Sequence, residues 1–180
     1  MSLFLFEIVP ASSGRDDIDK LLGEAGDAAV RVGGEIIESQ VTGARDRVFV
    51  VVEASGDAPL AAELTSSKLA GATEVTGPDH VRLVGAELED IKAIRPEAGY
   101  LVEWDFPDDL DMDTYLARKK AKAPKYAEVP EVSFLRTYVR EDMTKCLCLY
   151  DAPDEDVVRK AREVVSTPID RLHELDGKQG

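Results

Sequence analysis

An internal repeat is the feature of this sequence that most restricts its fold. Apolar, strand-like runs at residues 3–9 and 100–106 each enclose a glutamate, Glu7 and Glu103. Two later runs, RVFVVVEA and KCLCLYDA, each end in an acidic residue and alanine and then continue into a helical pattern. Matching points are 96 to 98 residues apart, which is typical of two related modules in one chain. A duplicated module predicts a pseudo-symmetric cavity around which the two copies can diverge.

The hydrophobic periodicity of each module predicts the order strand, helix, strand, strand, helix, strand. In the first module we expect strands over 3–9, 34–41, 47–54 and 80–84, with helices over 15–32 and 58–69. In the second module we expect strands over 100–106, 131–139, 145–151 and 169–175, with helices over 113–122 and 154–165. This order of elements is that of a ferredoxin-like unit.

A ferredoxin-like module covers only one face of its sheet with helices, so the other face must be buried against a partner. The second copy supplies that partner. We therefore predict an α+β fold of tandem ferredoxin-like modules (βαββαβ twice), whose sheets pack as a pseudo-dimeric α/β barrel. The modules span residues 1–85 and 99–176, joined by a connector over 86–98 and followed by a tail over 177–180.

Composition excludes several classes of partner. The net charge of −14 argues against nucleic acid, because phosphate binding requires clustered lysine and arginine. The one basic cluster, residues 118–125, is interpreted as a solvated helix end, where cations are favoured. No apolar run is long enough for a membrane span, and MSLFLFEIVP is predicted to be a strand rather than a leader. We expect a cytoplasmic protein, because the two cysteines, in a Cys-Leu-Cys strand pattern, imply no disulfide.

Alternation along the strands of the second module predicts a polar wall on the face opposite the helices. On this interior face we expect Glu103, Phe134, Arg136, Tyr138, Cys146, Cys148, Tyr150 and His173. The first module has Val48, Val50 and Val52 in the corresponding strand, which predicts an apolar wall opposite. The assignment depends on strand register, since a slip of one residue moves every side chain to the other face. We expect a ligand to contact Glu103, Phe134, Arg136, Tyr138 and Tyr150.

Several short motifs follow one another in the second module. They are FLRTYV at residues 134–139, Glu141-Asp142, Lys145, Cys148, Tyr150, Asp151-Ala152-Pro153 and Pro168-Ile169-Asp170-Arg171. In this order they resemble a bacterial family of unknown function that includes a small nickel-binding, nickel-responsive protein of ferredoxin-like fold. The resemblance covers about residues 99–176, and the first half shares it only through the internal repeat. It implies a ferredoxin-like fold and a cavity related to nickel.

One position departs from the family's pattern. Its recurrent histidine is Arg136 here, and a guanidinium stays protonated and cannot ligate a metal ion. Cys146, Cys148 and His173 could still supply thiolate and imidazole donors to nickel or another transition metal. However, their spacing matches no Cys-x-x-Cys or His-x-x-x-His motif, and cysteines on a core strand behave as small buried hydrophobes. We favour this second interpretation of the cysteines.

Glu103 and Arg136 also admit two interpretations. They form either a buried ion pair, or a site in which Arg136 binds a carboxylate ligand while Glu103 or Tyr138 moves a proton. The main hypothesis is a soluble binding protein that holds a transition metal or a small anionic ligand between the modules. One alternative is an enzyme similar to the cofactor-free monooxygenases or isomerases of paired α/β-barrel type, with Glu103, Tyr138 or His173 handling protons. The other is a non-catalytic module that forms a homodimer through its sheet edges.

Overall fold

In the computed structural model, which describes residues 1–94 and 97–176, strands and helices follow one another in the predicted order. The first half contains β1 (Ser2–Pro10), α1 (Arg15–Arg31), β2 (Glu35–Val41), β3 (Val48–Ala54), α2 (Ala58–Glu63) and β4 (Ala72–Val84), followed by α3 (Leu88–Ile94). The second half contains β5 (Tyr100–Asp105), α4 (Met112–Lys122), the 3-10 helix η1 (Ala123–Glu128), β6 (Ser133–Arg140), β7 (Lys145–Asp151), α5 (Glu155–Val164) and β8 (Arg171–Glu174). Part of the expected connector, residues 95–96, and the expected tail, 177–180, lie outside the described residues.

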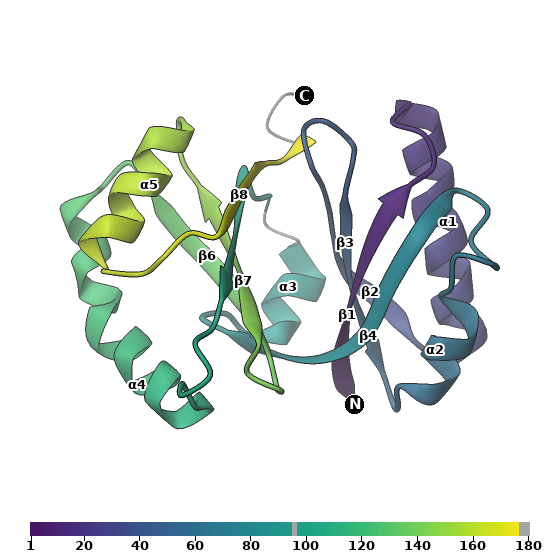
Figure 1. Ribbon diagram of the computed structural model, residues 1–180, viewed down its shortest axis with the longest axis horizontal. Coiled ribbons are helices and arrows are strands. Elements are labelled where there is room, and N and C mark those ends of the chain that lie inside the picture. Colours follow the sequence, from purple (N-terminus) through teal and green to yellow (C-terminus); the bar gives the residue numbers. More distant parts are fainter. Residues whose placement is uncertain (95–96, 177–180) are drawn as a thin grey trace.

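Within the described residues, eight strands form one antiparallel sheet in the order β2-β3-β1-β4-β6-β7-β5-β8. The pairing of β4 with β6 joins the two halves of the chain. At the opposite ends of the order, an isolated bridge pairs Thr42 with Leu175, and the Gly43 N–H donates to the Glu174 carbonyl at 2.7 Å. Figure 1 shows the two halves of the sheet facing each other, with α1 and α2 outside one half and α4 and α5 outside the other. The prediction of an α+β fold is confirmed.

Three apolar clusters fill this arrangement. Each half has a cluster between its part of the sheet and its own outer helices, which we call the helix side. The third cluster lies between the two halves, which we call the interior, and takes side chains from both. It includes Leu3, Leu5, Phe49 and Val51 from the first half and Leu101, Leu147 and Leu149 from the second. The two halves therefore share one buried face. None of the described helices is long and apolar enough to cross a membrane.

The helix starts follow from local sequence. The Asp111 carboxylate accepts from the Thr114 N–H at 2.7 Å at the start of α4, and the Asp154 carboxylate accepts from the Val157 N–H at 2.9 Å at the start of α5. Each satisfies one backbone donor that the first helical turn would otherwise leave unpaired. Along α1, the residues Ile18, Leu21, Ala25, Ala28 and Ala29 are buried, as the helical spacing predicts.

Two elements in the first half differ from the prediction. The helix expected over 58–69 ends at Glu63, because Leu64 leaves the helical conformation with a ψ of 78°. The strand expected over 80–84 begins instead at Ala72 and passes through the Gly-Pro pair that resembles a turn. Gly77 allows this, since its φ is +127° and a Cβ there would lie 2.5 Å from the Leu5 carbonyl oxygen.

The expected faces of β7 and β3 were wrong. Cys146, Cys148 and Tyr150 belong to the helix-side cluster of the second half, whereas Leu147 and Leu149 face the interior. Val48, Val50 and Val52 likewise pack on the helix side of the first half. Both strands are buried on both faces along their central residues, which are apolar on either side, so their alternation gives no signal. Pairing with β5 decides the face, because Val102 lies opposite Cys148 and both point to the helices.

Phe134 was also placed on the wrong face. The β6–β7 ladder has an irregularity between Phe134 and Arg136, which pair with the neighbouring residues Tyr150 and Leu149. Leu135, which lies between them, has no opposite residue on β7 and interrupts the alternation. Phe134 therefore packs on the helix side, while Arg136 and Tyr138 point to the interior.

Candidate functional site

Arg136 lies in the interior and is paired with a carboxylate of the first half. Its Nε and Nη2 atoms donate to Glu38 at 2.5 and 2.8 Å, and it is only 1% exposed. The Tyr138 hydroxyl and the Gln40 amide also donate to Glu38, at 2.7 and 2.6 Å. Burial, together with the Glu38 carboxylate, raises the pKa of Tyr138 well above its usual value. The carboxylate that Arg136 binds is therefore Glu38 of β2, not Glu103 and not a ligand.

Glu103 is the centre of a second interior group. It is 1% exposed and accepts from Lys145 Nζ, Arg171 Nε and His173 Nε2, each at 2.8 Å. Lys145 also donates to Glu7 at 2.9 Å, so Glu7 and Glu103 meet at one lysine. Burial alone would raise the pKa of Glu103, but the hydrogen bonds from His173, Lys145 and Arg171 hold it far below its usual range.

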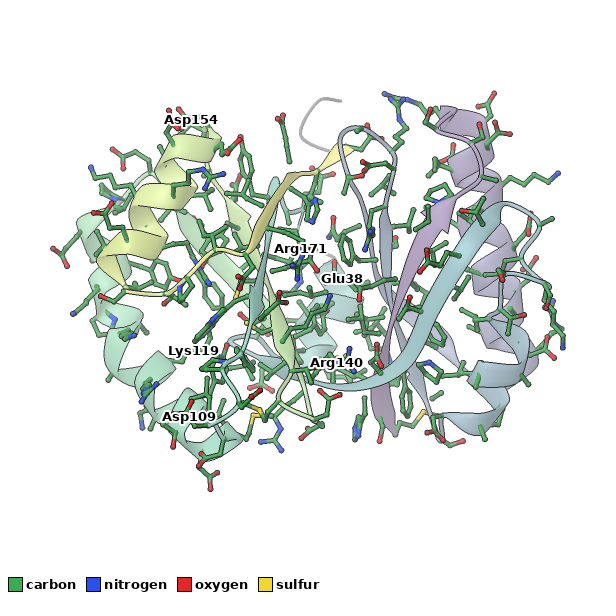
Figure 2. The ribbon with its side chains drawn as sticks, viewed as in Figure 1. Glu38, Asp109, Lys119, Arg140, Asp154 and Arg171 are labelled. Carbon is green, nitrogen blue, oxygen red and sulfur yellow. The ribbon has the colours of Figure 1, made fainter. Side chains whose placement is uncertain are left out.

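Both interior groups link the two halves of the chain. In Figure 2, Glu38 and Arg171 lie between the two halves of the sheet. Each of the buried carboxylates Glu38 and Glu103 accepts several hydrogen bonds, as buried charges require. The interior polar side chains therefore bind one another and hold the halves in register.

A pocket opens on the opposite face of the sheet, in the second half. It has a volume of about 260 Å³ and lies between α4, η1, α5 and the helix side of the strands. We call it the basic pocket, because its lining includes Arg118, Lys119, Lys122 and Arg162. The remaining lining consists of Trp104, Tyr115, Tyr126, Cys148 and residues 165–168. Figure 2 shows Lys119 between α4 and the sheet.

Arg162 lies at the buried end of the basic pocket and is 2% exposed. Its Nη1 atom donates to Tyr150 Oη at 3.1 Å and to Cys148 Sγ at 3.4 Å, and Nη2 donates to the Pro168 carbonyl. Its Nε atom is buried and has no hydrogen-bond partner among the described residues. Burial disfavours the guanidinium charge, but Cys148 and Tyr150 raise the pKa of Arg162 above its usual value. The pocket thus contains a permanent buried cation.

Cys148 is the one thiol that lines the basic pocket. It accepts from the Thr137 hydroxyl at 3.3 Å, and the Cys146 sulfur lies 3.8 Å away. The hydrogen bond from Cys146, together with the charges of Arg162 and Lys119, lowers the pKa of Cys148 well below that of an ordinary thiol despite its burial. Burial and the neighbouring Cys148 raise the pKa of Cys146. Of the pair, Cys148 is the thiol whose thiolate form these contacts favour.

The sequence carries a signal for this pocket on two of its helices. Tyr115, Arg118, Lys119 and Lys122 follow the spacing i, i+3, i+4, i+7, which places them on one face of α4. That face lines the pocket, although the basic cluster was interpreted as a solvated helix end. In α5, Arg162 interrupts the buried stripe formed by Val158, Ala161 and Val165. An arginine within an apolar stripe indicates a buried charge that needs partners.

The structure divides the predicted site residues between the two faces of the sheet. Glu103, Arg136, Tyr138 and His173 lie in the interior, whereas Phe134, Cys146, Cys148 and Tyr150 lie on the helix side. The proposed metal donors Cys146, Cys148 and His173 therefore do not meet, because the sheet separates the thiols from the imidazole. No group of three histidine, cysteine, aspartate or glutamate side chains within residues 1–94 and 97–176 is arranged to hold a metal ion.

Known proteins resemble this chain in two ways, and the first resemblance is confined to the second half. Residues 100–175 match the family model described as nickel responsive protein SCO4226-like, which confirms the resemblance noted in the sequence. The crystal structure of SCO4226 from Streptomyces coelicolor A3(2) aligns at 17% identity and a TM-score of 0.38, covering 43% of this chain and 94% of that one. No curated protein matches the chain.

Two solved structures align over nearly the whole chain. One is TA0507, named as a candidate chlorite dismutase, with 12% identity and a TM-score of 0.56, covering 97% of this chain and 95% of that one. The other is a candidate monooxygenase from Lactobacillus acidophilus NCFM, with 11% identity and a TM-score of 0.52, covering 97% and 93%. At this identity the likeness concerns the fold alone.

Proposed function

We propose that this protein binds a small organic anion in the basic pocket of its second half. In this proposal the fold is a closed, pseudo-dimeric barrel of two ferredoxin-like modules, residues 1–85 and 99–176, joined by the connector 86–98. The first module provides the partner sheet that a second chain would otherwise supply, so we propose that the barrel needs no homodimer. The binding site is asymmetric and belongs to the second module alone.

The observation that carries the proposal is a cluster of cations without acidic partners. Arg118, Lys119, Lys122 and Arg162 line one pocket, and none of them forms an ion pair with a carboxylate of the described residues. The whole chain carries a net charge of −14, so acidic partners are abundant elsewhere. Burial and repulsion from Arg118, Lys125 and Arg162 lower the pKa of Lys122, as uncompensated positive charge does. An anion relieves this repulsion.

The pocket walls indicate the rest of the ligand. Trp104, Tyr115 and Tyr126 contribute aromatic surface beside the cations, and Val165 contributes aliphatic surface. Ligand sites combine mostly apolar walls with a few placed polar groups. Lys119 and Lys122 are half-buried at the mouth, while the Arg162 charge already faces the Cys148 sulfur. We therefore propose a ligand whose acidic group meets the lysines and whose ring-sized apolar body enters the pocket.

Nickel is a weaker candidate, although the name of the matching family model refers to it. The residues present do not fit a nickel centre, because the two thiols and the imidazole lie on opposite faces of the sheet. Cys148, the thiol that lines the basic pocket, faces the Arg162 cation at 3.4 Å, which opposes a bound metal cation.

The enzyme alternative is also weaker. Glu103 and His173 bind each other within the interior ion network, and Tyr138 donates its hydroxyl to Glu38. A general acid or base must reach a substrate atom, and these groups are instead occupied by protein partners.

Trp104 provides a direct test, because it is the sole tryptophan and lines the pocket. Titration with benzoate, an aromatic carboxylate, is expected to change the Trp104 fluorescence in a saturable manner. Lys122→Met should weaken benzoate binding about fivefold, which corresponds to about 1 kcal/mol for a half-exposed ion pair. Lys120→Met is the matched control, since Lys120 lies on the same helix, is exposed and does not line the pocket. An unchanged signal, or equal weakening in both variants, would disprove the anion site.

A further inference from the structure

Cys148 is accessible in a way that Cys146 is not. Both thiols are almost fully buried and project from β7 to the helix side. Only Cys148 contributes to the lining of the basic pocket, which opens to solvent beside the rim lysines Lys119 and Lys122. A small molecule that enters the pocket therefore reaches one sulfur atom and not the other.

The surroundings of Cys148 favour its thiolate form and attract anions. Arg162 Nη1 lies 3.4 Å from the sulfur, the Thr137 hydroxyl donates at 3.3 Å, and the Arg162 Nε atom is buried without a partner among the described residues. The thiolate is the reactive form of cysteine, and neighbouring arginine and lysine stabilise it. Lys119 lies over the Phe134 ring with its Nζ atom 4.0 Å from the centroid, which holds this cation at the pocket.

An internal disulfide does not compete for this thiolate. The two sulfur atoms lie 3.8 Å apart as free thiols, beyond the S–S bond length of about 2.0 Å. To bond, the side chains of residues i and i+2 of a strand, roughly 6.6 Å apart along its axis, would have to bring their Cβ atoms to about 3.5–4.5 Å. Cys146 and Cys148 are the only cysteines of the sequence, and both are held in the paired strand β7. The Cys148 sulfur is therefore left for an external reaction partner.

We propose that Cys148 is a modification site that forms a mixed disulfide with small, anionic sulfur electrophiles, such as low-molecular-weight disulfides and thiosulfonates. The preference for negatively charged reagents rests on the proposed function, because the rim lysines that would bind the organic anion would also attract the reagent. With a thiosulfonate, the Cys148 thiolate attacks the sulfenyl sulfur. A new S–S bond forms, the S–S bond of the reagent breaks, and methanesulfinate leaves with the electron pair. The thiolate sulfur is oxidised and the sulfonyl sulfur is reduced.

Two thiosulfonates of opposite charge test this inference on the full-length, reduced protein. They are 2-sulfonatoethyl methanethiosulfonate, which is anionic, and 2-(trimethylammonium)ethyl methanethiosulfonate, which is cationic. The rate and position of labelling are measured by intact-mass and peptide mass spectrometry. We expect labelling at Cys148 alone, with the anionic reagent faster by at least about tenfold, because charged clefts concentrate ions of opposite sign. Cys146→Ser should keep the label, and Cys148→Ser should lose it.

Surface variants separate charge selection from folding. Lys119→Met and Lys122→Met should each reduce the ratio of anionic to cationic rates severalfold, whereas Lys120→Met should leave it unchanged. Labelling of both cysteines, labelling only after denaturation, or a faster reaction with the cationic reagent would overturn the inference. The benzoate titration on the same sample distinguishes the two proposals. If benzoate binds but Cys148 is not labelled, only the modification site is rejected. If benzoate does not bind and both reagents label Cys148 at the same rate, the anion pocket and the charge selectivity of the labelling are both rejected.

Discussion

Removal of Arg136 should destabilise the protein strongly, because it leaves a buried carboxylate without its countercharge. Glu38 is 8% exposed and receives two hydrogen bonds from the Arg136 guanidinium. Removing one partner of a buried ion pair costs about 3–5 kcal/mol. In the Arg136→Met variant, Tyr138 and Gln40 still donate hydrogen bonds to Glu38. We therefore expect the free energy of unfolding to fall by about 3 kcal/mol, the lower end of that range. For a chain of this length, that loss lowers the Tm by about 6–12 °C.

The double variant Glu38→Gln/Arg136→Met provides the decisive comparison. It removes both charges and keeps an acceptor for the Tyr138 hydroxyl, so we expect it to recover most of the lost stability. Urea unfolding followed by Trp104 fluorescence and by circular dichroism gives the free energy of unfolding of each variant. Arg159→Met is the control, since the exposed Arg159–Glu155 pair should contribute less than about 1 kcal/mol.

Two results would refute this reasoning. A single Arg136→Met variant that loses less than about 1 kcal/mol would show that the pair is not a buried bridge between the halves. A double variant no more stable than the single one would show that packing, and not the uncompensated charge, explains the loss.

The remaining predictions concern pH and nickel. Since the folded-state pKa of Glu103 lies far below that of an unfolded glutamate, about 4.3, its contribution to stability should be complete above about pH 5 and should decrease as the pH falls below about 4. Urea unfolding at a series of pH values from about 5 downward should show that the free energy of unfolding falls less steeply with pH in Glu103→Gln than in the unmodified protein, and equal slopes would contradict the assignment. Nickel titration followed by elemental analysis should show no stoichiometric metal, because Cys148 and His173 lie on opposite faces of the sheet. One bound nickel per chain that is lost in Cys148→Ala would overturn this expectation.

Much of the fold could be predicted from local pattern. Helices and strands appear in the expected order, and the α+β class and the resemblance over residues 100–175 are confirmed. The two misplaced boundaries, at Glu63 and at Ala72, depend on the backbone conformation of Leu64 and on a glycine within a long strand. Such local features of the backbone leave little trace in hydrophobic periodicity.

The candidate site was predicted less well. Alternation placed Arg136, Tyr138 and Glu103 on the interior face, where the structure also has them. Alternation could not assign Cys148 to a face, because all residues from Cys146 to Tyr150 are buried. Such a run fits equally well with either face turned toward the helices. The partners of the charged residues were also out of reach, since Glu38 is 98 residues from Arg136.

The sequence by itself determined the order of the helices and strands and the α+β class. Those properties arise from contacts within a few residues, which periodicity and capping residues record. Only the tertiary structure decided which face each strand presents and therefore which residues share a pocket. The physical reason is that strand pairing and the irregularity before Arg136 set the faces, and these depend on chain segments that meet only after folding. Local pattern thus predicts the order of the elements, whereas the basic pocket arises from the packing of α4, η1 and α5 against the second half of the sheet.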